Sequence, residues 1–248
     1  MQRPTETAPL LDLSGVTVRF GGVHALTEAD FVIPRGSVTA LIGPNGAGKS
    51  TVFNMVAGVY APSEGDIRFN GRPVHREKPW DRCRMGIART FQIVKPFASK
   101  TVLYNVMVGA YLRTNSTEKA RHKAEEVLAT LALDHLRDRP AANLTIADRK
   151  RLEIAKALAT DPQLLLLDEV MAGLRPTEVD DMIAIIKGLR DQGVTVFVIE
   201  HIMRAVMALS DRVVVIHFGQ KIAQGTPEEV TRDENVIKAY LGGEYGAA

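Results

Sequence analysis

The stretch from Ser37 to Val56, "SVTALIGPNGAGKSTVFNMV", decides the fold. It opens with a continuous apolar run, which is typical of a buried strand, and it closes with helical spacing. Between them, Gly43 to Ser50 match the phosphate-binding pattern G-x-x-x-x-G-K-[ST]. Glycines let backbone N–H groups turn toward phosphate oxygens, and the N-terminus of the following helix favours their charge. The sequence therefore predicts a strand, a phosphate-binding loop and a helix in succession.

Two side chains of this loop have specific chemistry. Lys49 would reach the β- and γ-phosphates of a nucleotide, and the Ser50 hydroxyl would ligate Mg²⁺. The alternative is a glycine-rich turn beside a surface lysine. The buried strand before the loop and the helix after it favour the nucleotide site.

Two further apolar runs end in polar residues. "QLLLLDE" ends in Asp168 and Glu169, and "VTVFVIEH" ends in His201. Downstream of a phosphate-binding loop, Asp168 would hold the magnesium shell and Glu169 would polarise the attacking water. Alone, such an acidic pair is more often a plain strand end, and a lone histidine is more often structural. His201 differs because its strand should end at the same sheet edge as Asp168.

The rest of the chain predicts an α/β fold with a mostly parallel sheet. "LDLSGVTVRF" and "ADFVIP" have the alternation of half-exposed strands, and "GDIRFNGRPV" indicates a hairpin that turns at Asn70-Gly71. From about residue 95 to 160 the pattern is helical, which interrupts the alternation and indicates an inserted subdomain. In that stretch, "RKR" at 149–151 is interpreted as the solvated side of a helix.

Composition limits the classes of partner. A net charge of +2 over 248 residues gives no electrostatic case for nucleic acid. One cysteine, Cys83, suits a reducing compartment. The start "MQRPTETAPL" lacks the apolar core of a secretory signal, and no window approaches the roughly 20 apolar residues that span a bilayer. A membrane role would need another chain to span the bilayer.

Taken together, these motifs resemble the ATP-binding subunit of an ABC transporter over nearly the whole chain. The resemblance implies one ABC ATPase domain of the P-loop NTPase class. Its parts would be a RecA-like core with a mostly parallel sheet, an antiparallel β subdomain and an inserted helical subdomain. We expect the domain at 9–241, with core and β subdomain at about 9–94 and 161–241, the helical subdomain at about 95–160, and frayed termini at 1–8 and 242–248.

The resemblance also assigns site residues. Phe20 matches the aromatic residue that stacks on adenine, and Gln92 matches the Q-loop glutamine, which serves catalysis and the metal. Asp168 and Glu169 match the Walker B aspartate and the catalytic glutamate, and His201 matches the switch histidine. The Walker A loop is matched by Gly43, Pro44, Asn45, Gly46, Ala47, Gly48, Lys49, Ser50 and Thr51.

The signature segment departs from the family. "LTIAD", Leu144 to Asp148, stands where the family has Leu-Ser-Gly-Gly-Gln. Thr145 keeps a hydroxyl for the γ-phosphate, and Ala147 keeps its N–H. A carboxylate facing ATP would cost on the order of 1 kcal/mol or more. The T-x-x-D spacing alternatively lets Asp148 fold back as a helix cap, which favours a working variant over an impaired signature.

Two milder departures follow the catalytic glutamate. Val170 replaces the usual proline, and Arg175 replaces an aspartate in the loop that, in the family, contacts the opposite subunit.

One branch of the family is especially similar. "ARTFQIVKPFASKTVLYNVMVGA", "LEIAKALATDPQLLLLDE" and "GTPEEV…VIKAYLG" resemble the ATPases of branched-chain amino-acid importers. This resemblance implies ATP and Mg²⁺ as cofactors and a head-to-tail dimer with a second, identical or homologous ATPase. It also implies two transmembrane permease subunits, whose coupling helices dock near residues 93–112, and indirectly an extracytoplasmic binding protein. The chain would be cytoplasmic, peripherally bound to the inner membrane.

Two other functions stay open. The chain could serve another system, such as metal-cluster assembly or lipopolysaccharide export. It could also be a regulatory subunit whose signature cannot complete the site of its partner ATPase.

Overall fold

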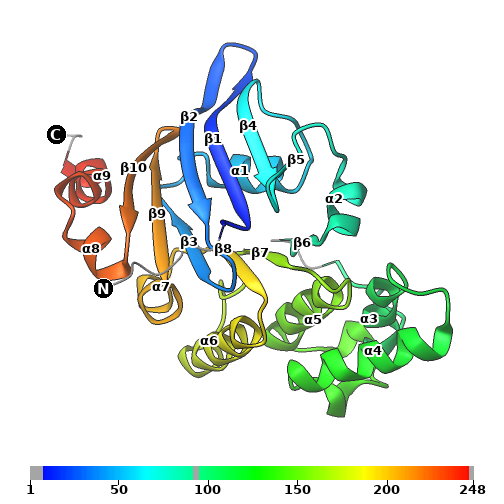
Figure 1. Ribbon diagram of the computed structural model, residues 1–248. Helices are drawn as coiled ribbons and strands as arrows, with labels where there is room; N and C mark the ends of the chain where they lie inside the picture. The colour runs from blue at the N-terminus through cyan, green and yellow to red at the C-terminus, as the bar shows by residue number, and fades with distance from the viewer. Residues whose placement is uncertain (1–7, 92–94, 246–248) are drawn as a thin grey trace, which may run out of the picture.

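The computed structural model describes residues 8–91 and 95–245 and contains two sheets with helices around them (Figure 1). The smaller sheet is antiparallel, in the order β2-β1-β4-β5. It consists of β1 (Leu11–Phe20), β2 (Val23–Ile33), β4 (Glu64–Phe69) and β5 (Arg72–Pro73). Asn70 and Gly71 turn the last hairpin with φ values of 52° and 73°, as the sequence predicts.

The larger sheet has the order β10-β9-β3-β8-β7-β6, and only the β9–β10 pair is antiparallel. Its strands are β3 (Val38–Ile42), β6 (Ile87–Arg89), β7 (Leu164–Asp168), β8 (Thr195–Ile199), β9 (Arg212–His217) and β10 (Gln220–Gly225). Every residue of β3, β7 and β8 is buried. The predicted α/β fold with a mostly parallel sheet is confirmed.

The helices form three groups in the chain. Before β6 come α1 (Lys49–Val56) and α2 (Pro79–Met85). Between β6 and β7 come α3 (Val102–Ala110), α4 (Thr117–Thr130), α5 (Ile146–Leu158) and the short 3₁₀ turns η1 (Asp134–Leu136) and η2 (Ala141–Asn143). After β7 come α6 (Pro176–Asp191), α7 (Met203–Leu209), α8 (Pro227–Arg232) and α9 (Glu234–Tyr245).

The last helix extends further than the sequence suggests. α9 runs to Tyr245, through residues 242–245 that were expected to be frayed. Once a helix is nucleated, each added residue costs little, and the buried Val236 fixes the start of α9. Among the described residues, no helix is both long and apolar enough to cross a membrane.

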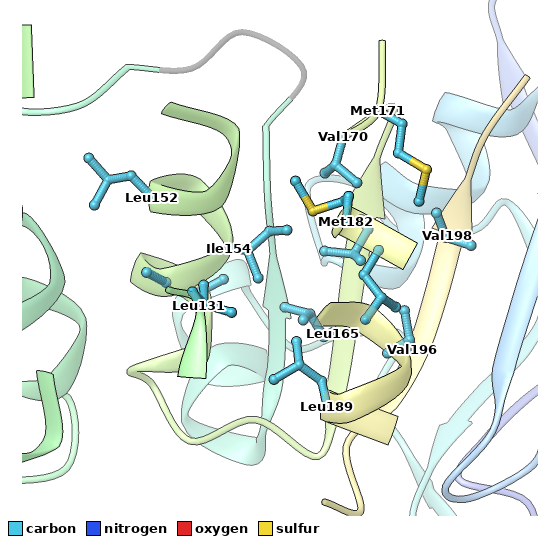
Figure 2. Packing of buried hydrophobic residues seen from close by; sticks show 14 of the residues in the cluster. Leu131, Leu152, Ile154, Leu165, Val170, Met171, Met182, Leu189, Val196 and Val198 are labelled. Carbon is cyan, nitrogen blue, oxygen red and sulfur yellow. The ribbon is translucent and has the colours of Figure 1, made fainter. Parts of the chain in front are cut away.

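Two apolar layers fix the central strands from both faces. Val196 and Val198 of β8 pack with Leu165 of β7 and with Met182 and Leu189 of α6 (Figure 2). The alternate residues Phe197 and Ile199 belong to the other layer, together with α1 and the antiparallel sheet. Burial on both faces explains why these strands read as continuous apolar runs. It also holds the loops at their carboxyl ends in fixed positions.

Candidate nucleotide-binding site

The predicted site segments meet at one edge of the larger sheet. β3, β7 and β8 are parallel, so their carboxyl ends point the same way. Gly43 follows β3 and Asp168 ends β7 opposite Ile199 of β8, which lies two residues before His201. The structure thus brings the phosphate-binding loop, the acidic pair and His201 to a common edge.

Two glycines give the loop its shape. A Cβ on Gly43, at φ 155°, would lie 2.0 Å from the carbonyl oxygen of Ile216, and one on Gly48, at φ 105°, would lie 2.6 Å from that of Ala25. Only glycine fits such close backbone approaches. Gly48 also precedes α1 without a side-chain cap. The first N–H groups of α1 are therefore suited to an anion.

A cavity of about 490 Å³ opens on this loop. Of the predicted residues, its lining includes the loop from Asn45 to Thr51 and also Glu169. Residues that the sequence did not single out complete the wall. They come from the start of β2 and from the turn between β9 and β10: Val23, His24, Ala25, Phe218 and Gly219. The Gly219 N–H donates to the Ala47 carbonyl at 2.9 Å, which braces the loop. No local motif could have indicated a wall that distant hairpins build.

The predicted adenine contact, Phe20, is not among these lining residues. Its ring packs edge-on against Tyr60, with the centroids 5.1 Å apart, and stays 48% exposed. Phe218 supplies an aromatic surface at the cavity itself.

The Lys49 ammonium lies folded over the loop. Its Nζ donates to the carbonyl oxygens of Gly43 at 2.6 Å and Pro44 at 2.8 Å. Burial lowers the pKa of Lys49, and the carboxylates of Glu169 and Asp168 oppose that shift. Phosphate oxygens entering the cavity would offer the ammonium a charged partner in place of these carbonyls.

Asp168 lies beside a second cavity, of about 580 Å³, which Ser50 and Arg89 also line. Burial raises the pKa of Asp168, while the hydrogen bond and charge of Arg89 lower it. Asp168 Oδ2 accepts from Arg89 Nη2 at 3.0 Å. Arg89 was not singled out from the sequence, because its partners Asn54 and Asp168 lie 35 and 79 residues away.

The donor set fits magnesium. Ser50 and Asp168 supply the oxygen ligands that Mg²⁺ prefers. No group of three or more His, Cys, Asp or Glu residues able to hold a metal occurs among residues 8–91 and 95–245. An ion at Ser50 and Asp168 would need phosphate oxygens to complete its shell, as nucleotide-bound Mg²⁺ does. When bound there, Mg²⁺ would neutralise charge on the phosphates.

Glu169 has a backbone conformation unusual for its residue type, with φ 49°. Its N–H donates to the Ile199 carbonyl at 3.0 Å, and its carbonyl accepts from Lys150 Nζ at 3.0 Å. This backbone position makes Glu169 part of the wall of the cavity that Lys49 also lines. Strain of this kind is commonly kept at functional sites.

The interpretation of "RKR" as a solvated helix side is wrong for two of its residues. Lys150 is only 9% exposed and reaches the Glu169 carbonyl. Arg151 Nη2 pairs with Asp181 Oδ2 of α6 at 3.2 Å. Lys150 and Arg151 reach the residue after β7 and α6 respectively, which offer acceptors that helical periodicity alone cannot reveal.

A buried carboxyl group lies behind Glu169. Glu200 is 1% exposed, and its Oε1 accepts from the Met171 N–H at 2.9 Å. Burial raises the pKa of Glu200. Glu200 thereby ties the end of β8 to the chain that follows the catalytic glutamate candidate. The neighbouring His201 is exposed and is not among the residues lining the first cavity. Gln92 lies outside the described residues.

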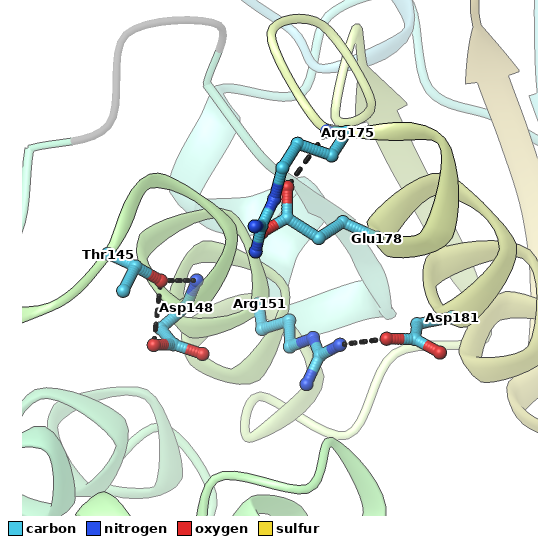
Figure 3. A network of polar contacts seen from close by, with 6 residues as sticks. All are labelled: Thr145, Asp148, Arg151, Arg175, Glu178 and Asp181. Carbon is cyan, nitrogen blue, oxygen red and sulfur yellow. Dashed lines mark hydrogen bonds and ion pairs between the residues drawn. The ribbon is translucent and has the colours of Figure 1, made fainter.

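The signature segment begins α5 with a local hydrogen-bonded pair (Figure 3). Thr145 Oγ1 accepts from the Asp148 N–H at 3.1 Å and donates to Asp148 Oδ2 at 2.7 Å. The carboxylate thus folds back onto the threonine hydroxyl. Ala147 is buried and Ile146 is exposed. The only proton of the Thr145 hydroxyl is committed to Asp148.

Arg175 forms a similar local pair. The Arg175 Nη2 atom lies 2.8 Å from Glu178 Oε1, and the main-chain N–H of Arg175 donates to Glu178 Oε2 at 2.8 Å (Figure 3). The side chain is 80% exposed, so this ion pair is held at the protein surface.

Comparison with known proteins places the chain. Residues 26–172 match the family described as ABC transporter, and residues 220–246 match the one described as branched-chain amino acid ATP-binding cassette transporter. The chain is 40% identical over 250 residues to the high-affinity branched-chain amino acid transport ATP-binding protein BraF of Pseudomonas aeruginosa, covering 94% of this chain and 98% of that protein. It is 34% identical to the probable transport ATP-binding protein LivG of Archaeoglobus fulgidus, covering 94% and 95%.

Solved structures agree with the architecture. A nucleotide-free ATP-binding cassette from an ABC transporter is similar with a TM-score of 0.86 and 31% identity, covering 94% of this chain and 99% of that one. The ADP conformation of another such cassette gives a TM-score of 0.87 and 32% identity, covering 95% and 100%.

Proposed function

Because the chain belongs to the ABC transporter family and is an ATPase of that family, we propose that it powers an importer of branched-chain or related amino acids. The observation that carries this proposal is the joint placement of Lys49, Ser50 and Glu169 around one cavity, with Asp168 beside Ser50. The resemblance to transport ATP-binding proteins such as BraF supports the class of substrate.

The proposed roles follow the geometry. The loop N–H groups and Lys49 bind the phosphates, and Ser50 and Asp168 hold Mg²⁺. Glu169 is the base that polarises the attacking water. His201 and Gln92 complete the catalytic set, and Phe20 contacts the base of the nucleotide; these three roles rest on the family resemblance.

The proposed assembly includes a second ATPase subunit and transmembrane permeases. ABC ATPases work as dimers with transmembrane permeases, and we infer a second ATPase subunit that contributes its own signature to this site. Thr145 and Ala147 of this chain would in turn face the nucleotide of that partner. The chain would lie on the cytoplasmic face of the inner membrane, and a binding protein outside would deliver the substrate.

A second candidate function follows from the signature. The Thr145 hydroxyl donates its hydrogen bond to Asp148, so in this arrangement it has no proton to offer a γ-phosphate. A regulatory subunit that binds ATP but leaves the site of its partner impaired would have this property.

The test is reconstitution of the chain with its permease and partner ATPase in proteoliposomes that hold ATP. We expect uptake of leucine, isoleucine or valine that depends on the binding protein and is lost in Lys49→Ala. ATP-dependent uptake of a different solute only, or co-purification with soluble cluster-assembly proteins, would reject the amino-acid proposal.

A further inference from the structure

Arg89 is the last residue of β6. Its guanidinium lies beside Asp168, the carboxylate that is expected to hold Mg²⁺. Its Nη2 is 3.0 Å from Asp168 Oδ2, and its Nη1 donates to Asn54 Oδ1 of α1 at 2.5 Å. The two charged side chains are only 14% and 8% exposed. A buried ion pair of this kind is strongly coupled, because little water screens it.

The pairing is incomplete on the arginine side. Arg89 Nε is buried without a hydrogen-bond partner. Its guanidinium lies over the Phe91 ring, 5.6 Å from the centroid. An unsatisfied buried donor lowers the benefit of the present arrangement. The guanidinium is thus held mainly by Asp168 and Asn54.

Arg89 also has room to move. It lines the cavity of about 580 Å³ together with Ser50 and Asp168. It lines a further cavity of about 270 Å³ that includes Val59 and Phe91. A guanidinium that leaves Asp168 can therefore stay over the aromatic ring, where a cation is stabilised, without burial of an unpaired charge.

We propose that Arg89 is a positioning residue that neutralises Asp168 until magnesium arrives with the nucleotide and then yields the carboxylate to the metal. This inference rests on the proposed function. Two cations beside one buried carboxylate repel each other, so Arg89 and Mg²⁺ compete for Asp168. Since the displaced side chain lines the adjoining cavities, their shape would depend on whether Mg²⁺-nucleotide is bound.

The competing explanation is a purely structural ion pair. In that case removing the guanidinium weakens the fold equally with and without Mg²⁺-nucleotide. Competition instead predicts a cost confined to the metal-free protein, because the metal replaces the lost charge. It also predicts tighter magnesium-dependent binding.

The experiment measures ATP binding by calorimetry in the full chain, with Glu169→Gln in every variant to suppress hydrolysis. Each variant is titrated with ATP in Mg²⁺ and in EDTA. The quantity compared between variants is the dissociation constant in EDTA divided by the dissociation constant in Mg²⁺. We expect this ratio to rise about tenfold in Arg89→Gln, since a hydrogen bond to a charged group contributes about that factor. Arg89→Lys, which keeps the charge, should change the ratio much less.

A matched control is Arg113→Gln, whose guanidinium bonds the carbonyls of Thr160 and Arg84, both at 2.8 Å. Its ratio should equal that of the parent. The second readout is thermal unfolding. Arg89→Gln should melt below the parent in EDTA, and the difference should shrink when Mg²⁺ and ATP are added.

An unchanged or smaller ratio in Arg89→Gln, or an equal loss of melting temperature in all conditions, would overturn the competition. If Arg89→Gln does not fold, the melting temperature of Arg89→Lys decides, because an ammonium cannot reproduce the contacts of the guanidinium fork. A loss in EDTA that shrinks when Mg²⁺ and ATP are added supports the competition, and an equal loss in both conditions overturns it. Failure of the parent protein to bind ATP in either buffer would refute the proposed function instead.

Discussion

Removing the Thr145 hydroxyl tests whether its hydrogen bonds to Asp148 stabilise the start of α5. The hydroxyl makes two bonds, accepting from the Asp148 N–H at 3.1 Å and donating to its carboxylate at 2.7 Å. Loss of such a helix cap costs about 1 kcal/mol, and the exposed side-chain bond adds up to about 1 kcal/mol. Thr145→Ala should therefore lower the free energy of unfolding by about 1–2 kcal/mol.

Thermal unfolding measures this loss as roughly 2–8 °C for a domain of this size. Ser116→Ala is the matched control, because Ser116 caps α4 through the Lys119 N–H at 3.3 Å and has no acid at the third helical position. A double-mutant cycle of Thr145→Ala with Asp148→Ala, which removes the accepting oxygen, should give a coupling of at least about 0.5 kcal/mol. Zero coupling would refute the folded-back carboxylate.

ATP turnover then separates a working signature from an impaired one. If Thr145 keeps the carboxylate away from the nucleotide, Asp148→Asn in the assembled transporter should change turnover by less than about threefold, under 1 kcal/mol. An acceleration of tenfold or more would show that the carboxylate repels the phosphates, and the regulatory function would be favoured.

Three further predictions concern other parts of the site. Burial raises the pKa of Glu200, so this carboxyl group stays protonated to higher pH in the folded state than in the unfolded state. The contribution of Glu200 to stability therefore falls as pH rises from the ordinary glutamate pKa toward the raised one. As pH rises above the ordinary glutamate pKa, Glu200→Gln should therefore gain stability relative to wild type in urea titrations, and a difference that stays constant with pH would contradict this. The Arg82 guanidinium donates to four main-chain carbonyls, and burial lowers its pKa to about 10. Arg82→Met should therefore lower the free energy of unfolding by at least about 3 kcal/mol, and a loss below about 1 kcal/mol would refute this role. Gly43→Ala would place a methyl group 2.0 Å from the Ile216 carbonyl and should abolish ATP binding in a filter assay, a result that retained affinity would contradict.

Local patterns were sufficient for the elements and for the phosphate-binding loop. β3, β7 and β8 are apolar at every position because both faces are covered, and an apolar run of strand length shows this directly. The parallel pairing of these strands then places Asp168 and His201 at one edge.

Contacts between distant segments could not be predicted. Arg89 meets Asp168 across 79 residues, and Lys150 meets the Glu169 carbonyl although it stands in a charged helical run. Phe218 reaches the cavity through a hairpin turn whose sequence carries no motif. Such positions depend on tertiary packing, which overrides helix periodicity and short patterns.

The most direct test of the account compares ATP hydrolysis by the assembled transporter with wild-type chain and with Glu169→Gln. Loss of a general base reduces turnover by about 10²-fold or more, while ATP binding should persist. Glu234→Gln is the matched control, because that carboxylate pairs only with the exposed Lys238 in the part of the chain described here. We predict ATP hydrolysis by wild type and the control and its loss in Glu169→Gln with binding intact. Equal hydrolysis by all three would contradict the assignment of Glu169 as the catalytic base.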